Sequence, residues 1–134
     1  MPTLPFRFLS VLFLAAFSSF AAADVLVVTD RAHPVQASPG ARVIELDLPA
    51  RIEMALSSGL PSDPGRAEEI ARQRVRDREL QRRLFVAWQG LAEARSLSVT
   101  KVPAVVVDRR YVVYGETDVS RALARIETYR SAQP

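Results

Sequence analysis

Runs and periodicities of apolar residues divide this chain into strands and helices. Residues 25–28 and 104–107 are uninterrupted apolar runs, mostly of β-branched residues. Runs of this length are typical of strands that are covered on both faces. We therefore predict four strands, at residues 24–29, 42–47, 104–107 and 111–114, with a turn at 108–110 that makes the last two a hairpin.

Helical periodicity occupies the middle of the chain. Pro49 suits the first turn of a short helix, which Gly59 ends. Asp63 is a suitable N-cap before Pro64, and the helical pattern that follows continues to about Leu97. At 1.5 Å per residue this pattern is about 50 Å long, longer than a small domain is wide. We predict either a bend, near Gly90, or one half that projects from the domain.

Two aromatic patterns bear on the core. Leu84, Phe85, Trp88 and Leu91 form a helical stripe that predicts core positions. Tyr111 and Tyr114 are three apart on a strand and should point to opposite faces, so at most one of them builds the core.

A final amphipathic helix closes the chain. Thr117 is a good N-cap, and Asp118 follows in the expected first turn. Apolar residues then recur at i, i+3, i+4 and i+7, namely Val119, Ala122, Leu123 and Ile126. This spacing predicts a helix packed on the sheet.

The N-terminus predicts export. Arg7 precedes an apolar run at 8–20, and Ala21-Ala22-Ala23 supplies the small residues of a cleavage site. The run is shorter than the roughly 20 apolar residues that span a bilayer. We expect a signal peptide at 1–23, cleaved after Ala23, and a single periplasmic domain at 24–134 without a membrane-spanning segment. A retained signal anchor is the alternative.

Composition excludes several kinds of chemistry. The chain has no cysteine, so thiol–disulfide catalysis is impossible, because the thiolate is the reacting species. The chain has a single histidine, and it has neither a spaced acidic loop nor a glycine-rich phosphate loop. We therefore predict no metal and no cofactor, and no small-molecule substrate is evident.

The last third of the chain resembles a thioredoxin-like fold. Val102-Pro103 precedes a strand, a hairpin, Gly115 and a closing helix. In that fold a proline, usually with a cis peptide bond, stands before the third strand. The fold class expected is therefore α/β and thioredoxin-like, with a mixed sheet of about four strands flanked by helices and a long arginine-rich helix. Only about a dozen residues join the first two strands, so the first crossover helix should be one turn or absent.

A closer resemblance covers nearly the whole of 24–134. The segments that carry it are Val27-Val28-Thr29-Asp30-Arg31-Ala32-His33-Pro34-Val35, Glu45-Leu46-Asp47, Gly59-Leu60-Pro61-Ser62-Asp63-Pro64, Ala87-Trp88-Gln89-Gly90, 101–108 and 111–119. The sequence is similar to exported proteins encoded in bacterial integrating conjugative elements, distantly similar to the TrbC/TraW-like components of conjugative pili. The resemblance implies a periplasmic accessory of a type IV secretion, or mating-pair formation, apparatus, with other apparatus proteins as its partners.

One candidate site lies where thioredoxins carry their cysteines. In a thioredoxin-like fold, the loop with Asp30, Arg31 and His33 adjoins the segment Lys101-Val102-Pro103. His33 could act as a base that Asp30 orients, as in a small hydrolase or isomerase. The alternative is that Asp30 bonds to the backbone of the turn. A groove beside Pro103 could in either case bind an extended partner by strand addition.

The second candidate site is the arginine-rich segment, with Arg72, Arg76 and Arg83 as its representatives. The pairs Glu68–Arg72 and Glu79–Arg83 have the favourable i, i+4 order, but arginines also repeat at that spacing. The surplus positive charge predicts an acidic partner surface. We rank protein above lipid headgroups and both above nucleic acid, which conjugation moves. The expected function is therefore a non-enzymatic assembly or adaptor protein; the alternative is an arginine-helix binder of nucleic acid or anionic surfaces.

Overall fold

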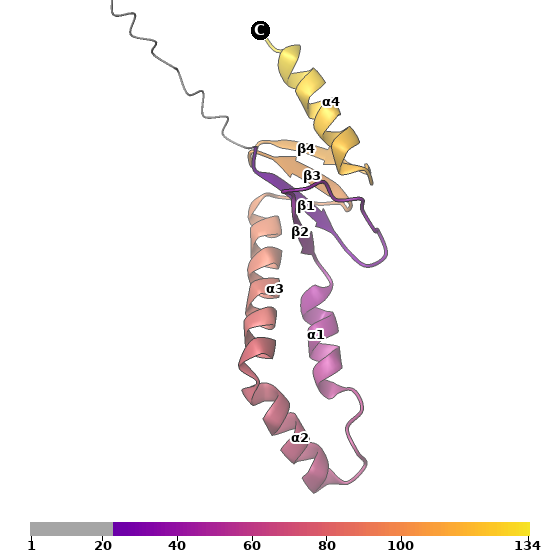
Figure 1. The fold of residues 1–134 in the computed structure, drawn as a ribbon, viewed down its shortest axis with the longest axis vertical. Helices are drawn as coiled ribbons and strands as arrows, with labels where there is room; N and C mark the ends of the chain where they lie inside the picture. The colour runs from indigo at the N-terminus through magenta and orange to yellow at the C-terminus, as the bar shows by residue number, and fades with distance from the viewer. Residues whose placement is uncertain (1–22) are drawn as a thin grey trace, which may run out of the picture.

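A mixed four-stranded sheet lies at the centre of the part of the chain that the computed structural model describes, residues 23–134 (Figure 1). The strands are β1 (Val25–Thr29), β2 (Arg42–Glu45), β3 (Ala104–Val107) and β4 (Tyr111–Tyr114), in the order β2-β1-β3-β4. β1 is parallel to β2 and antiparallel to β3, which is antiparallel to β4. The predicted mixed α/β fold is thus confirmed, and the arrangement is compatible with a thioredoxin-like architecture. The predicted signal peptide lies outside the described residues, apart from Ala23.

The crossover from β1 to β2 contains no helix, as the sequence predicts. Prolines and a glycine interrupt residues 30–41, and proline cannot donate the bonds of a helix interior. The segment is instead held against the start of α4 (Val119–Ser131), where Gln36 N donates to Thr117 O at 2.8 Å and Val119 N donates to Gln36 O at 3.2 Å. The loop is therefore fixed at both its ends and its middle.

The two faces of the sheet bury separate apolar clusters. On one face Leu26, Val28 and Val106 pack with Ala94 of α3 (Arg78–Ser96). On the other face Val27, Val105 and Val107 pack with α4, through Val119, Ala122 and Ile126. This alternation follows from the period of two along a strand, and it explains why the runs at 25–28 and 104–107 are apolar throughout.

The helices α1 (Leu48–Ser57), α2 (Pro64–Arg76) and α3 extend away from the sheet (Figure 1). We call residues 48–89, which comprise α1, α2 and α3 as far as Gln89, the helical arm. The remainder of residues 23–134 is called the sheet body. Of the two predictions for the long helical pattern, the projection of one half from the domain is therefore the one that is confirmed.

The break in the long helical pattern is at Asp77, and the predicted bend near Gly90 is wrong. Asp77 has an extended backbone, and its Oδ1 accepts from Glu79 N at 2.9 Å and Leu80 N at 3.3 Å, so it caps a new helix. Gly90 is instead the place where α3 approaches the sheet. A Cβ on Gly90 would lie 3.3 Å from Cγ2 of Ile44, so the missing side chain permits this approach.

The predicted core role of the aromatic stripe is also wrong in part. Phe85 is 62% exposed and Trp88 is 46% exposed, whereas Leu84 and Leu91 are half-buried. Ala87, between them, is buried and lines a cavity together with residues of β2, so Phe85 and Trp88 do not supply the core positions that their spacing predicts.

Two smaller expectations concern the C-terminal third. The N-cap of α4 is Asp118, not Thr117, and its carboxylate accepts from Arg121 N at 3.2 Å. Tyr111 is half-buried and packs against the α4 cluster, whereas Tyr114 is exposed. The prediction that at most one of these tyrosines builds the core is therefore confirmed.

Candidate functional site

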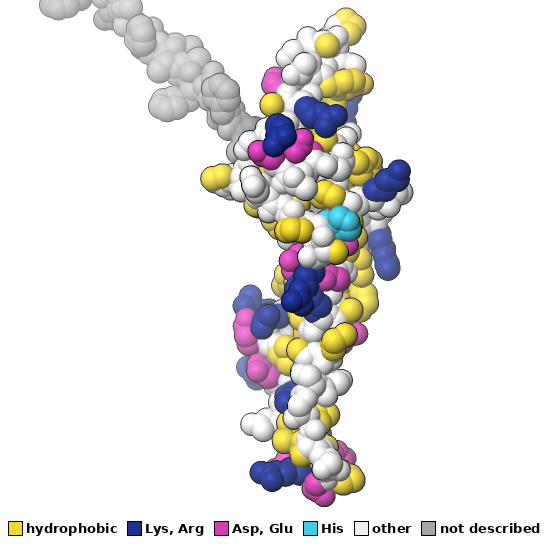
Figure 2. Space-filling model, turned by 90° about the vertical axis from the view of Figure 1, so that its right-hand side faces the viewer, with side chains coloured by type: hydrophobic (Ala, Val, Ile, Leu, Met, Phe, Trp, Pro, Cys, Tyr) yellow, Lys and Arg dark blue, Asp and Glu magenta, His cyan; other side chains and the backbone are white. Residues whose placement is uncertain are grey.

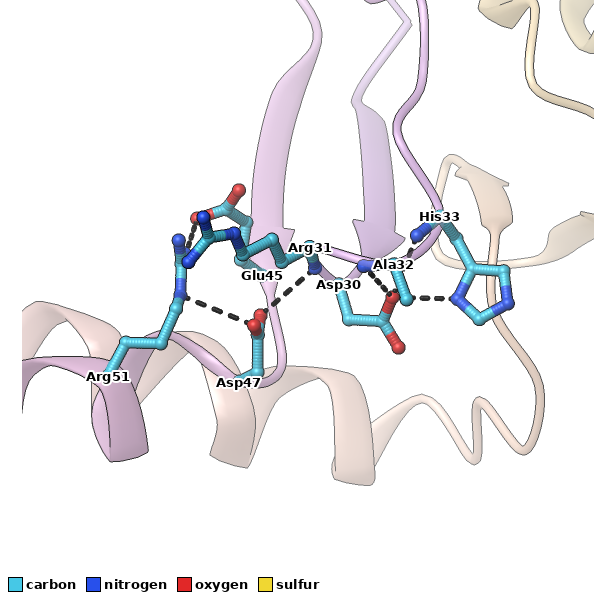
Figure 3. Close-up of polar contacts among 7 residues, drawn as sticks. All are labelled: Asp30, Arg31, Ala32, His33, Glu45, Asp47 and Arg51. Atoms are coloured by element: carbon cyan, nitrogen blue, oxygen red, sulfur yellow. Dashed lines mark hydrogen bonds and ion pairs between the residues drawn. The ribbon is translucent and has the colours of Figure 1, made fainter. Parts of the chain in front are cut away.

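The first candidate site is a turn at the end of β1 in which one carboxylate organises the backbone (Figure 3). Oδ1 of Asp30 accepts from Ala32 N at 2.9 Å and from His33 N at 3.0 Å, and it lies 2.7 Å from Nδ1 of the His33 ring. An aspartate that bonds the amides two and three residues ahead is the local signature of an Asx turn. Asp30 therefore does both things that the sequence suggests: it bonds to the backbone of the turn, and it pairs with His33.

The electrostatics of this turn favour an ionised Asp30. The hydrogen bond from the His33 ring, aided by the charge of that ring and by the amides of His33 and Ala32, lowers the pKa of Asp30 against the opposing effect of burial. With Asp30 ionised, Nδ1–H of His33 donates to it and Nε2 faces outward. The His33 side chain is 49% exposed, and Figure 2 shows this histidine, in cyan, at the surface of the sheet body.

The arrangement supplies an oriented histidine, and the hydroxyl of Thr29 is already bonded to the backbone of the same turn. Thr29 is buried, and its Oγ1 donates to the backbone carbonyl of His33. Thr29 therefore fixes the turn. A bonded pair of Asp30 and His33 can offer the outward edge of an oriented imidazole ring to a partner.

A polar network that sequence reasoning missed joins this turn to α1 (Figure 3). The amide of Arg31 donates to Oδ1 of Asp47 at 3.3 Å. Oδ2 of Asp47 lies 3.3 Å from Nε of Arg51, an ion-pair distance without hydrogen-bond geometry, and the guanidinium of Arg51 also donates to Glu45. The sequence pattern that could have revealed part of this network is the i, i+4 spacing of Asp47 and Arg51. The network means that the turn and the base of the helical arm are positioned together.

Lys101, Val102 and Pro103 lie at the same end of the sheet as this turn. Val28 pairs with Ala104, so the turn that follows β1 and the segment that precedes β3 leave the sheet side by side. The Val102–Pro103 peptide bond is cis, Pro103 is buried, and Val102 packs against the cluster on the α3 face. Lys101 is exposed. The predicted juxtaposition of the two segments is thus present in the fold.

The arginines of the second candidate site lie on the helical arm, away from the sheet (Figures 1 and 2). Arg72 pairs with Glu68 as the spacing predicts, and Arg83 lines a hollow with Leu48, Ile52 and Val86. The predicted pair of Glu79 with Arg83 is not formed. Glu79 bonds instead to Arg82, at 3.1 and 2.8 Å, one residue earlier on the same helix face.

Arg76 and Arg83 therefore remain available to a partner. Among residues 23–134, no ion pair within 4.0 Å involves either of them. Arg74, by contrast, donates to the carbonyls of Leu56 at 2.8 Å and Ser58 at 2.7 Å, and so satisfies the C-terminal end of α1. One arginine thus holds the arm together, and its neighbours supply surplus charge.

Comparison with known protein families identifies the family of this chain. The family model described as "Protein of unknown function (DUF1525)" matches residues 22–132. The chain belongs to this family. The match includes every strand and every helix of the described residues, with both candidate sites of the DUF1525 chain inside it. No curated protein and no solved structure matches significantly. Within residues 23–134 of the DUF1525 chain, no helix combines the length and the apolar character that crossing a membrane requires.

Proposed function

We propose that this DUF1525 protein is a non-enzymatic periplasmic assembly or adaptor component of a conjugative transfer apparatus. The observation that carries the proposal is the helical arm. Met54 is 72% exposed, Phe85 62% and Val75 59%, and these residues come from all three helices of the arm. Large apolar side chains that are exposed together on helices packed against one another are typical of surfaces that bind another protein.

The charges of the arm support a protein partner with an acidic surface. Arg76 and Arg83 have no ion pair among the described residues, and they lie on the same helices as Val75 and Phe85. Apolar side chains next to unpaired arginines are the composition of protein interfaces, in which arginine and aromatic residues are enriched. A nucleic acid would use the arginines and could stack on Phe85, but it would leave the aliphatic side chains of Met54 and Val75 unused.

The resemblance to proteins of integrating conjugative elements supplies the setting, and it supports export to the periplasm. The polar turn at Asp30 supports a role without catalysis, since Thr29 bonds to the backbone and no other group is aligned with His33 among the contacts of this turn. A thioredoxin-like domain without cysteines retains its binding surfaces and loses its redox chemistry.

Site-specific photocrosslinking in mating cells tests this proposal. A photoreactive phenylalanine derivative would replace Phe85 in one strain, Arg76 in a second and Arg31 in a third. Phe85 is the sharpest position, because the substitution preserves an exposed aromatic ring. Glu127, an exposed residue of α4 at a distance from both candidate sites, provides the control position.

We expect crosslinks to pilus or secretion-channel subunits from Phe85 and Arg76 but not from Glu127. A crosslink from Arg31 as well would add the Asp30 turn to the docking surface. Recovery of DNA from Arg76 alone would favour the arginine-helix binder of nucleic acid. If no position yields a crosslink while transfer still depends on the protein, the adaptor proposal is wrong.

A further inference from the structure

The sheet has two free edges, and they differ in charge. Among residues 23–134, β2 and β4 each pair with one neighbour only, so each presents backbone N–H and C=O groups that these residues leave unpaired along its outer side (Figure 1). An edge of this kind can accept an extended segment from another chain, and the side chains around it determine which segment fits.

The charges beside the β2 edge are neutralised within the chain. Arg42 donates to Glu93 at 3.1 and 2.9 Å, and Glu45 accepts from Arg51. The cavity between β2 and α3, of about 290 Å³, therefore has no unsatisfied charge to select a partner.

The cavity beside the β4 edge is lined by positive charges that have no ion pair among the described residues. A cavity of about 490 Å³ opens between β4 and α4, and its lining includes Arg110, Arg125, Tyr111 and Tyr129 but no acidic residue. Among residues 23–134, neither Arg110 nor Arg125 has an ion pair within 4.0 Å. The guanidinium of Arg110 lies 5.4 Å from the centre of the Tyr111 ring, which holds this charge beside the strand.

The register of β4 shows which backbone groups are free. Gly115 N donates to Pro103 O at 2.9 Å, and antiparallel strands alternate between bonded and non-bonded pairs. The amides of Val113 and Tyr111 therefore face β3, and those of Val112 and Tyr114 point to the free edge. The side chains of Val112 and Tyr114 are 37% and 41% exposed on the face of the sheet opposite α4.

We propose that the free edge of β4 binds an extended acidic segment of a partner protein by strand addition. Alternate side chains of an added strand lie on opposite faces of the sheet. Acidic side chains on the α4 face would meet Arg110 and Arg125, and apolar side chains on the other face would pack on Val112 and Tyr114. A second copy of this chain is a poor occupant, because its arginines would face those of the first.

Fluorescence anisotropy with the purified protein tests this inference. The probe is a labelled nonapeptide in which glutamate alternates with valine. One control peptide replaces glutamate with lysine, and another carries N-methyl groups on alternate amides, which removes the donors of one strand edge. We expect binding of the first peptide only, with an affinity that falls as salt is added.

The protein variants separate the charges from the edge. Arg110→Gln and Arg125→Gln should each weaken binding about two- to fivefold, as expected for exposed ion pairs. Arg121→Gln is the matched control, since it removes the same charge from an exposed residue of α4 that does not line the cavity. Val112→Pro, which removes an outward-facing amide, should abolish binding, and the two glutamine variants keep the test valid if that variant does not fold.

Several outcomes would overturn the inference: equal binding of the acidic and basic peptides, undiminished binding of the N-methylated peptide, or no effect of Arg110→Gln with Arg125→Gln. Competition by a single-stranded oligonucleotide for the same arginines would assign the cavity to nucleic acid. Concentration-dependent dimers lost on Val112→Pro would assign it to a second copy. The site is separate from the helical arm, so crosslinking at Phe85 and peptide binding at β4 can succeed or fail independently.

Discussion

In the sheet body the side chains of Val27, Val105 and Val119 are completely inaccessible to solvent, whereas in the helical arm Val75 and Phe85 are more than half exposed. Both apolar clusters of the sheet consist of residues of the body. The helix α2 buries no residue at all. Residues of the same type therefore differ in their surroundings: in the body they are buried and stabilise the fold, and on the arm several of them remain exposed.

In the arm only Pro49, Ile52 and Ala87 are buried, so polar contacts of the backbone carry much of its organisation. Arg74 bonds to the carbonyls at the end of α1, Asp63 caps α2 by accepting from Arg66 N, and Asp77 caps α3. Such contacts define where each helix begins and ends, but each adds little to the free energy of unfolding, about 1 kcal/mol for a cap. The arm should consequently open locally more readily than the body, as segments with few buried apolar contacts do.

The largest expected effect compares two valines. Val105→Ala should lower the free energy of unfolding by about 2–3 kcal/mol, because it removes two buried methyl groups and leaves a cavity. Val75→Ala should change it by less than about 0.5 kcal/mol, since that side chain is already exposed. Urea denaturation of both variants measures the difference. Equal losses would show that the arm has a core of its own and would remove the contrast between the regions.

A smaller effect tests the junction inside the arm. Asp77→Ala should cost about 1 kcal/mol, because Glu79 N and Leu80 N lose their acceptor. Hydrogen exchange should speed up at the start of α3 and leave β1 and β3 unchanged. Asp77→Asn, which retains a capping oxygen, is the control. Slower exchange in the alanine variant would mean that α2 and α3 fuse into one helix when the cap is removed.

The strands were predictable from the sequence because their signal is local. Four consecutive apolar residues at 25–28 and 104–107 predict strands covered on both faces, and the structure confirms both. The site turn was predictable in the same way, since Asp30 and His33 are three residues apart. The break at Asp77 was also encoded locally, by an aspartate followed by Glu79, but the continuing helical periodicity hid it.

What could not be predicted depends on the tertiary arrangement. The stripe with Phe85 and Trp88 has the spacing of a core helix, and only the projection of the arm leaves it exposed. Gly90 signals a weak point in an isolated helix, but in the fold it permits contact with Ile44. The bond from the amide of Arg31 to Asp47 likewise depends on where α1 begins relative to the turn.

Glu93 lies on the part of α3 that packs on the sheet, and it bonds to two other segments of the body. It therefore tests how much ion pairs contribute to holding α3 on the sheet. Its carboxylate accepts from Arg42 of β2 and, at 3.2 Å, from Arg109 of the hairpin turn. The hydrogen bonds from Arg42, together with the charges of Arg42 and Arg109, lower the pKa of Glu93 despite its partial burial. A carboxylate with a lowered pKa stabilises the folded state at pH values above its pKa in the unfolded chain, about 4.3. That stabilisation is lost as the pH falls through the lower pKa of the folded state.

Glu93→Gln should therefore cost up to about 1 kcal/mol at neutral pH, and this difference from the unmodified protein should shrink as the solution is acidified below about pH 4. Urea denaturation at neutral and acidic pH measures it. Glu53→Gln is the matched control, because Glu53 is an exposed acid of α1 without an ion pair among the described residues. A loss at Glu93 that did not vary with pH would assign its role to packing. The ion pairs would then not hold α3 to the sheet, and its attachment would depend on apolar packing, through Ala94 and the contact between Gly90 and Ile44.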